Sequence, residues 1–426
     1  MRLSPKSLSG NKKFNYGLVI VFAAALSYFF SAPGQTFFIS GFIDIYVNDM
    51  GWDRATVSSL YSFATLLSGL LIFSVGNIAD KIGVKKTMIA VGILLGGICF
   101  WNSFNVSLVT LFIGFAFSRF LGQGSMTLLP SLVLPKWFVK KRAMSFSIMS
   151  IGAVIASTFI PIINASLFKI ISWRDVWRIW GILVWIIFIP VTFFYLFNRP
   201  QDIGRLPDNE SSSDDLHEGI KFSKEEEYFT PKEAMKTFAF WGMLYCQIIL
   251  PLITTGLTFH LVSIMQTKNM TASNAAMVLS LFSMVSFPIT LIAGRFMDGV
   301  KQHHVAAVIS LIELSALIAL FFSNSITMVI LFAILHGTAN ALQSVNNGVV
   351  WSNYFGTLYL GSIRGMSMVG NVISSSIGPL PFGILFARFG NYNAALILVM
   401  VLPILGFVTA IFSKKPVAPK RETVSY

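Results

Sequence analysis

Residues 76–86 read GNIADKIGVKK, a short charged stretch that separates two long apolar ones. Residues 294–298 read GRFMD and repeat the Gly-x-x-x-Asp pattern 218 residues later, again directly after an apolar stretch. The same offset relates residues 152–161 to residues 370–379, where Gly, Val, Ile, Ser and Pro positions coincide. Two separated blocks with one offset predict that the chain consists of two related halves.

The apolar stretches are long enough to cross a membrane. Apolar residues make up 55% of the 426 residues and charged residues only 12%, about half the charge of a soluble globular protein. This composition excludes a soluble enzyme, a disordered scaffold and a free nucleic-acid-binding protein. Because about 18 or more apolar residues can span the hydrocarbon core as a helix, the sequence predicts twelve spans, at approximately 15–43, 55–75, 87–104, 107–133, 143–168, 176–197, 238–265, 273–296, 305–323, 326–352, 365–387 and 391–412.

The basic residues predict the orientation of these spans. Few Lys and Arg residues lie in the loops on one side, and most lie in the loops on the other, which we assign to the cytoplasm by the positive-inside rule. The net charge of +13 is therefore a topology signal and does not indicate nucleic-acid binding. We expect a multi-pass protein of the cell membrane with both termini in the cytoplasm.

The longest polar stretch, residues 198–236, divides the spans six and six. It holds ten carboxylates and few large apolar residues, a composition typical of a flexible linker. We predict an N-terminal six-helix bundle over residues 1–197, a cytoplasmic linker over 198–236, and a C-terminal six-helix bundle with a short cytoplasmic tail over 237–426. The expected fold class is thus an all-α integral membrane protein with twelve transmembrane helices in two pseudo-symmetric bundles, and such parallel repeats place a substrate site between them at mid-membrane.

Residues 76–86 resemble the cytoplasmic loop motif of the major facilitator superfamily, and the resemblance extends over nearly the whole chain. In that family an Asp and basic residues of this loop gate the inner face. The alternative for Asp80 is ordinary loop chemistry, and Lys85 and Lys86 need do no more than hold the loop inside. The candidate gating residues are Gly76, Asp80, Gly83, Lys85, Lys86, Gly294 and Asp298.

Residues 137–152, WFVKKRAMSFSIMSIG, look like the fifth-span signature of monocarboxylate transporters and of the related oxalate:formate antiporters. This resemblance implies a small carboxylate as substrate. The chain also departs from that branch, because Thr290 stands where those carriers have an eighth-span Arg, and the eleventh-span Lys of the oxalate carriers falls near Ser367. The missing cations argue against a dianion more strongly than against a monocarboxylate.

Ionisable side chains inside a bilayer are costly and therefore mark functional candidates. Arg119, with Gln123 and Thr127 on the same face of the predicted helix, offers a planar fork for a carboxylate, or else pairs with backbone or a neighbouring span. A histidine can exchange a coupling proton or serve as a hydrogen-bonded structural residue. For Glu313 we expect an interhelix pair or a protonated acid rather than a coupling site. The candidates of this kind are Arg119, His260, Glu313 and His336.

Uncharged polar residues also recur on predicted helix faces. Lipid cannot satisfy amide groups, so these stripes face protein or water, and we favour cavity lining over helix packing. The candidates are Gln35 in the first span, Asn340, Ser344, Asn347 and Trp351 in the tenth, and Ser367 and Asn371 in the eleventh. Pro33–Gly34 and Gly378–Pro379 are predicted hinge points.

The sequence contains no Walker loop, nucleotide-binding fold, zinc pattern or nucleophile elbow, so we expect no enzyme, no metal and no cofactor. The function we expect is secondary active transport of a small organic solute, a monocarboxylate with proton coupling, by alternating access. The alternatives are a proton-driven efflux antiporter of a drug or hydrophobic metabolite, and a non-transporting membrane sensor. The expected partners are an organic acid, a proton or another coupling ion, and the lipid bilayer, with no nucleic acid, and the protein is expected to be a monomer.

Overall fold

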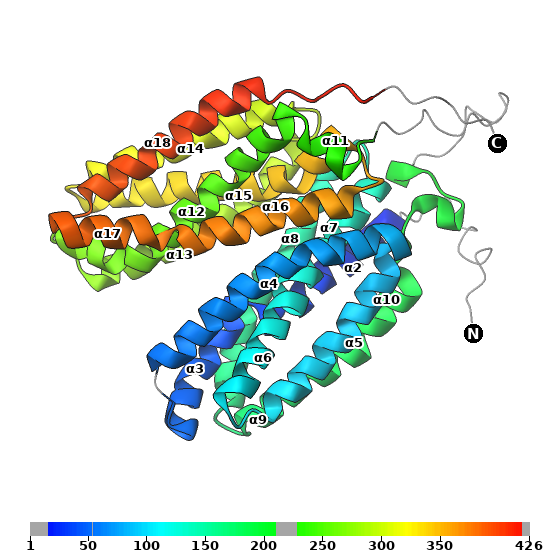
Figure 1. Ribbon diagram of the computed structural model, residues 1–426, viewed down its shortest axis with the longest axis horizontal. Helices are drawn as coiled ribbons and strands as arrows, with labels where there is room; N and C mark the ends of the chain where they lie inside the picture. The colour runs from blue at the N-terminus through cyan, green and yellow to red at the C-terminus, as the bar shows by residue number, and fades with distance from the viewer. Residues whose placement is uncertain (1–15, 53, 210–227, 420–426) are drawn as a thin grey trace. The chain divides into compact units, whose positions relative to one another are not determined.

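The computed structural model describes residues 16–52, 54–209 and 228–419, and these residues form helices and loops without strands (Figure 1). Twelve segments are long and apolar enough to cross a membrane, as predicted. The first half contains α2 (Tyr16–Phe30), η1 (Ala32–Gly34), α3 (Thr36–Met50), α4 (Arg54–Ile82), α5 (Val84–Ser103), α6 (Leu108–Ser118), η2 (Arg119–Ser125), α7 (Met126–Trp137), α8 (Arg142–Leu167), α9 (Trp173–Leu183), η3 (Val184–Phe188), α10 (Ile189–Tyr195), η4 (Pro200–Ile203) and η5 (Pro207–Asn209). The second contains α11 (Pro231–Met235), α12 (Phe238–Thr267), α13 (Ala272–Phe296), α14 (Gln302–Phe321), α15 (Ile326–Phe355), α16 (Leu360–Ile377), α17 (Pro379–Phe389) and α18 (Asn393–Phe412).

Many large apolar side chains on these helices point outward. Phe63 on α4 is 66% exposed, Ile186 on η3 is 66% exposed and Phe259 on α12 is 77% exposed. Side chains of this size favour transfer out of water by about 1.5–3 kcal/mol each. The outward faces therefore match a hydrocarbon environment.

Polar side chains fix several helix starts. Ser107 accepts a hydrogen bond from the Thr110 amide (3.2 Å) at the start of α6, and Thr237 accepts one from the Phe240 amide (3.2 Å) at the start of α12. Each cap satisfies a backbone donor that the helix itself cannot pair. The apolar runs therefore begin as helices at defined residues.

Four of the twelve spans are built from more than one helical segment. The first span is interrupted by η1 between α2 and α3, at the Pro33–Gly34 pair, and the eleventh is interrupted between α16 and α17, at Gly378–Pro379. Proline lacks a backbone donor and interrupts the helical hydrogen-bond ladder, which explains why both breaks fall at these positions. The fourth and sixth spans instead contain wider π-helical turns, η2 and η3.

The chain divides into two compact units, Met1–Glu226 with Leu360–Val369, and Glu227–Tyr359 with Gly370–Tyr426. The first part of α16 therefore belongs to the first unit. The domain boundaries at residues 197 and 237 stay predictions, and residues 210–227 of the expected linker lie outside the described residues.

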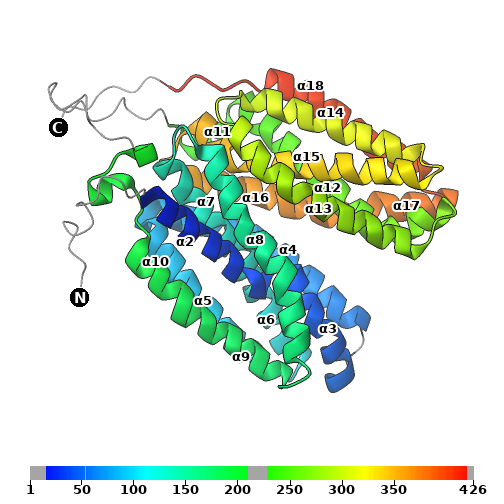
Figure 2. The same cartoon turned by 180° about the vertical axis from the view of Figure 1, so that it is seen from behind.

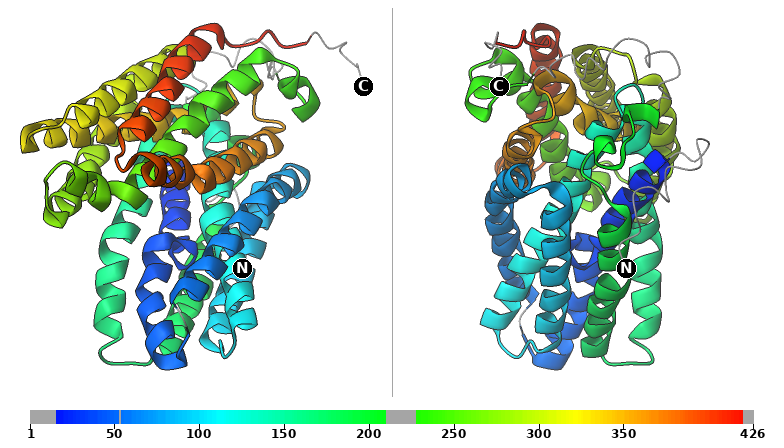
Figure 3. Two further views of the ribbon diagram at one scale, coloured as in Figure 1. Left: turned by 60° about the vertical axis from the view of Figure 1, so that its left-hand side comes forward. Right: turned by 90° about the vertical axis from the view of Figure 1, so that its right-hand side faces the viewer.

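In the first unit α2 packs against α7 and α8, α4 against α6, and α5 against α9; the helices run side by side in Figure 3. Small residues permit close packing in membranes, where apolar burial alone does not drive helices together. A methyl group on Gly152 of α8 would lie 2.0 Å from the carbonyl oxygen of Ala25 on α2. This contact therefore requires glycine.

In the second unit α14 packs against both α15 and α18, and α15 also packs against α13 (Figure 2). The buried core includes Leu317 of α14, Phe332 of α15 and Leu396 of α18. Phe382 of α17 joins the same core. An ionisable group inside such apolar packing is costly unless it is paired.

Candidate functional site

The broken first span supplies the surroundings of Arg119. A methyl group on Gly34 would lie 2.2 Å from the Ser118 carbonyl oxygen, and one on Gly122 would lie 2.7 Å from the Gly34 Cα. Glycines at both positions therefore let η1 and η2 touch backbone to backbone. Because the helix is interrupted here, the Gly34 carbonyl is available to an outside donor.

Arg119 is almost fully buried, at 4% exposure. Its Nη1 donates to the Gly34 carbonyl oxygen (3.0 Å) and to Thr36 Oγ1 (3.3 Å), and its guanidinium carbon lies 5.0 Å from the centre of the Tyr61 ring. No described residue accepts a hydrogen bond from Nε, which is itself buried, or from Nη2. The Nε–Nη2 edge fits a carboxylate side-on with two parallel hydrogen bonds, and because it is unpaired we call it the open edge.

The π-helical turn η2 changes the register after Arg119. In a π-turn backbone hydrogen bonds join residues five apart rather than four, and the Met126 amide accordingly donates to the Leu121 carbonyl oxygen. The common face predicted for Arg119 and Gln123 stays a prediction. Gln123 is partly buried, and Gln35 donates from Nε2 to Ser31 Oγ (2.9 Å) at the break in the first span.

A second arginine inside a span, Arg364, was not predicted from the sequence. With the eleventh span predicted to begin at residue 365, Arg364 was counted with the cytoplasmic loops, but α16 begins at Leu360 and contains it. Its guanidinium carbon lies 5.4 Å from the centre of the Phe146 ring on α8, and its charge interacts with Tyr28 on α2. A helix start placed by hydropathy alone falls after a charged residue, and so this arginine was excluded from the span.

Asp80 caps the start of α16. Its Oδ1 accepts a hydrogen bond from the Gly361 amide (2.9 Å), and its Oδ2 accepts from the Ser362 amide (2.7 Å) and from Ser362 Oγ (2.8 Å). No side chain of α16 caps this terminus itself. A carboxylate at a helix N-terminus satisfies unpaired amides and interacts favourably with the helix dipole. Gly76 and Gly361 permit the approach, since a methyl group on Gly76 would lie 2.0 Å from the Gly361 carbonyl oxygen.

The remaining candidate gating residues of the loop at residues 76–86 do not share the contacts of Asp80. Gly83 has a φ of +91°, which favours glycine, and the Lys85 amide donates to Asn198 Oδ1 (2.9 Å) at the start of α5. The Lys85 ammonium lies 4.6 Å from the centre of the Phe197 ring, whereas Lys86 is exposed. In the related motif of the second half, Gly294 is buried near the end of α13 and Asp298 follows that helix.

His336 and Glu313 form a pair in the second unit. His336 Nδ1 lies 2.9 Å and 3.0 Å from the two carboxylate oxygens of Glu313, which is fully buried. His336 Nε2 lies 3.3 Å from Thr254 Oγ1 and 3.4 Å from Asn340 Nδ2. The expected interhelix pair of Glu313 is thus present, and its partner is one of the two candidate histidines.

His260 has both ring nitrogens occupied. Nε2 lies 3.2 Å from the Pro379 carbonyl oxygen, and Nδ1 lies 3.2 Å from the Tyr392 hydroxyl. A carbonyl only accepts, so Nε2 carries the proton and Nδ1 accepts from Tyr392. The ring also stacks on Phe382. This arrangement favours the structural alternative for His260.

The remaining polar candidates differ in exposure. Trp351 is fully buried and donates to Gln247 Oε1 (2.8 Å), while Asn347 accepts from Gln343 Nε2 (3.0 Å). Ser344 is exposed and donates to the Ala341 carbonyl (2.8 Å), and Ser367 is buried and donates to the Arg364 carbonyl (2.9 Å). Asn371 is partly buried, and its Oδ1 accepts a hydrogen bond from none of the described residues. Their contact with a solute stays a prediction.

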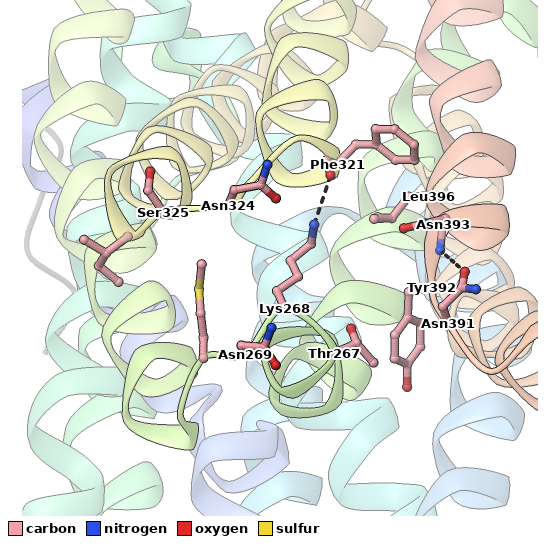
Figure 4. Close-up of a pocket in the computed structure, with 12 residues that line it drawn as sticks. Thr267, Lys268, Asn269, Phe321, Asn324, Ser325, Asn391, Tyr392, Asn393 and Leu396 are labelled. Atoms are coloured by element: carbon pink, nitrogen blue, oxygen red, sulfur yellow. Dashed lines mark hydrogen bonds between the residues drawn. The ribbon is translucent and has the colours of Figure 1, made fainter.

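A cavity of about 610 Å³ lies at the ends of several second-unit helices (Figure 4). Lys268 reaches into it and donates to the Phe321 carbonyl oxygen (2.9 Å), and burial lowers the pKa of its ammonium group. Asn391 Oδ1 accepts from the Asn393 amide (3.0 Å) at the start of α18. None of the predicted solute-binding residues lines this cavity.

The sequence of this chain matches one protein family. A family model described as Major Facilitator Superfamily matches residues 24–312. No curated protein sequence matches the chain significantly.

Several solved structures are similar over nearly the full length. The human organic anion transporter MFSD10 (TETRAN) has a TM-score of 0.68 at 14% identity, covering 92% of this chain and 99% of that one. The E. coli transporter FucP, a fucose:proton symporter, has a TM-score of 0.66 at 14% identity, with 94% and 100% covered. The proton:xylose symporter XylE, bound to 6-bromo-6-deoxy-D-glucose, has a TM-score of 0.67 at 13% identity, with 93% and 95% covered. At these identities the likeness shows the fold alone.

Proposed function

Because the chain belongs to the major facilitator superfamily, we propose that it is a secondary active transporter that moves a small monocarboxylate with a proton by alternating access. The superfamily consists of transporters rather than enzymes, and the twelve candidate spans fit a multi-pass membrane protein. The cell membrane as location and cytoplasmic termini are part of the proposal.

The open edge of Arg119 carries the proposal. A buried guanidinium is costly unless an anion or several acceptors compensate its charge. Nη1 has two neutral acceptors, and no described carboxylate forms an ion pair with Arg119. A monocarboxylate on the Nε–Nη2 edge would supply both the missing charge and the missing acceptors.

The substrate class has further support from the sequence. The fifth-span stretch resembles the monocarboxylate branch. Thr290, which donates to the Ser286 carbonyl (2.8 Å), stands in place of that branch's eighth-span arginine, and this departure argues against a dianion more strongly than against a monocarboxylate. A single open guanidinium edge suits one carboxylate better than two. The structural neighbours include an organic anion transporter and a proton:xylose symporter, so the fold accommodates either class of substrate.

Transport by the purified protein in liposomes tests the proposal. Labelled lactate, pyruvate, acetate and oxalate are offered with and without an inside-alkaline pH gradient. We expect gradient-driven accumulation of a monocarboxylate, and loss of that accumulation in Arg119→Ala because the guanidinium edge proposed to hold the anion is removed. Arg388→Ala, which removes an exposed arginine at the end of α17, is the matched control and should transport normally.

Three outcomes would count against this function. Normal uptake by Arg119→Ala would remove Arg119 from the solute site. If a folded protein moves none of the four acids, the efflux antiporter becomes the leading function, and a panel of cationic and neutral compounds follows. Binding of an acid without flux would indicate a sensor.

A further inference from the structure

The hydrogen bonds around His336 indicate which of its ring nitrogens carry a proton. Thr254 Oγ1 has one proton and donates it to Asn340 Oδ1 (3.4 Å), so it accepts from His336 Nε2 (3.3 Å). Asn340 Nδ2 donates to the His336 carbonyl oxygen (3.0 Å). A second proton lies between Nδ1 and Glu313, because Nδ1 is 2.9 Å from a carboxylate oxygen. The pair therefore holds both protons and has no net charge.

Losing one proton would leave this pair with a charge of −1. A net charge inside the apolar core of a membrane protein is costly, and Glu313 has no exposed surface through which water could compensate it. With the proton bound, the pair is either an imidazolium with a carboxylate or an imidazole with a carboxylic acid, and both have no net charge. Groups this close exchange one proton as a unit.

The two members of the pair differ in accessibility. His336 lines a small, mostly apolar cavity of about 20 Å³ together with Thr254, Thr258, Phe282 and Phe332. The side chain of His336 is 7% exposed and that of Glu313 is 0% exposed. His336 is thus the accessible member and Glu313 the buried countercharge.

Other titratable groups on the packed helices lie farther away along the chain. His303 and His304 precede Glu313 on α14 by nine or more residues, about 14 Å along a helix. On α15, Tyr354 lies 18 residues beyond His336; on α13, Arg295 lies 13 residues beyond Phe282, which contacts His336. On α12, Thr254 contacts His336, and the titratable residues of that helix are Tyr245, Cys246 and His260. Helix α18 contains none.

Tyr245, Cys246 and His260 have contacts of their own. Tyr245 donates to the Leu402 carbonyl (3.3 Å), Cys246 donates to the Gly406 carbonyl (3.5 Å), and His260 pairs with Tyr392 and Pro379. No described ionisable side chain other than these two partners forms an ion pair with Glu313 or His336. Among the described residues the pair therefore has no third charged neighbour in contact.

We propose that Glu313 and His336 form the proton-binding site that couples transport to the proton gradient. When the pair loses one proton, the remaining proton stays on Nδ1, facing the Glu313 carboxylate, and Nε2 becomes an acceptor. Thr254 Oγ1 then donates to Nε2 and no longer to Asn340 Oδ1. Binding or losing one proton thus rearranges the hydrogen bonds that join α12 to α15, at a residue, Asn340, predicted to line the solute path. The coupling part of this inference rests on the proposed function.

Two transport assays and one titration test the site. Glu313→Gln keeps an acceptor for His336 Nδ1 but cannot lose or gain a proton. With labelled lactate as the probe, we expect accumulation driven by a pH gradient to fall about tenfold or more. Exchange of lactate across the membrane at equal pH, which requires no net proton movement, should stay within about twofold of the wild type. His304→Gln, which removes an exposed histidine from the same helix, is the matched control and should match the wild type in both assays.

The titration needs no solute. Between about pH 5 and 8, the range in which histidine titrates, purified Glu313→Gln should take up one proton fewer than the wild type, while Glu313→Asp restores it. An unchanged proton count, or normal gradient-driven accumulation by Glu313→Gln, overturns the proton site. If the wild type moves lactate in neither assay, the proposed function fails with this solute, and the titration alone decides whether the pair binds a proton.

Discussion

Arg119 makes its hydrogen bonds through one nitrogen, Nη1, and so keeps the opposite edge of its guanidinium open. The sequence predicts a buried arginine at this position, because a charge inside an apolar span must be compensated. It does not predict the Gly34 carbonyl as a partner, because that oxygen is available only where the first span is interrupted.

Glu313 and His336 show the same limit at another residue pair. Each was recognised in the sequence as a costly buried group, yet 23 residues and a loop separate them. Helical spacing relates residues three and four apart on one helix, and it cannot relate residues on neighbouring helices. Their pairing therefore required the packing of α14 on α15.

Arg119→Lys separates charge from geometry. Lysine keeps one positive charge but lacks the planar edge, and its ammonium is a compact point charge. We expect uptake of a monocarboxylate to fall about tenfold or more, while size-exclusion chromatography shows an unchanged folded protein. Uptake equal to that of the wild type would show that charge alone suffices and that the open edge is not used.

At the scale of elements, the start of α16 depends on α4. The loop motif was recognised from its Gly and Asp spacing, but the three donors that Asp80 accepts were not predicted, since the eleventh span was expected to begin five residues later. The interruptions at Pro33–Gly34 and Gly378–Pro379 were predicted, because proline acts locally. The π-turns η2 and η3 were not, because they depend on packing.

Asp80→Ala should destabilise this contact. It leaves two amides and one hydroxyl at the start of α16 without their acceptor, which costs about 1–3 kcal/mol per buried group before water compensates. We expect a lower melting temperature in detergent, measured by fluorescence-detected chromatography. Ser362→Ala removes only the hydrogen bond from the hydroxyl group and should lower the melting temperature less than Asp80→Ala does. Equal melting temperatures for Asp80→Ala and the wild type would contradict the capping role.

Lys268 gives a pH-dependent prediction for the second unit. Burial lowers the pKa of its ammonium below the usual 10.5. At pH values between the lowered pKa and 10.5, the unfolded chain therefore binds more protons than the folded one. The free energy of unfolding must then rise with pH in that window. Lys268→Met should flatten this rise in thermal unfolding measured from neutral pH to pH 10.5. A slope equal to that of the wild type would show that Lys268 titrates as an exposed lysine.

At the scale of the whole molecule, the twelve spans and the superfamily were predicted from apolar length, the repeat and the loop motif. These signals survive in the sequence because each span must be apolar along its entire length. The division into a first unit that includes Leu360–Val369 depends on packing between distant segments, which no local pattern expresses.

The orientation in the membrane can be measured with single cysteines. In a Cys99→Ser, Cys246→Ser background, Asn391→Cys should react with a membrane-impermeant maleimide added outside intact cells, and Lys140→Cys should react only after permeabilisation. The reason is the excess of basic residues in the loops assigned to the cytoplasm. Labelling of Lys140→Cys in sealed cells would reverse the orientation.

The π-turn at η2 has a consequence for the history of this helix. A turn that bonds residues five apart accommodates one residue more than the α-helix around it, so it marks where a residue can be inserted without breaking the span. Deleting one residue between Arg119 and Ser125 would restore a regular helix and leave Arg119 close to its present register relative to α7. An alignment with a relative that lacks this turn would therefore require a one-residue gap here, inside a membrane span and beside the buried arginine.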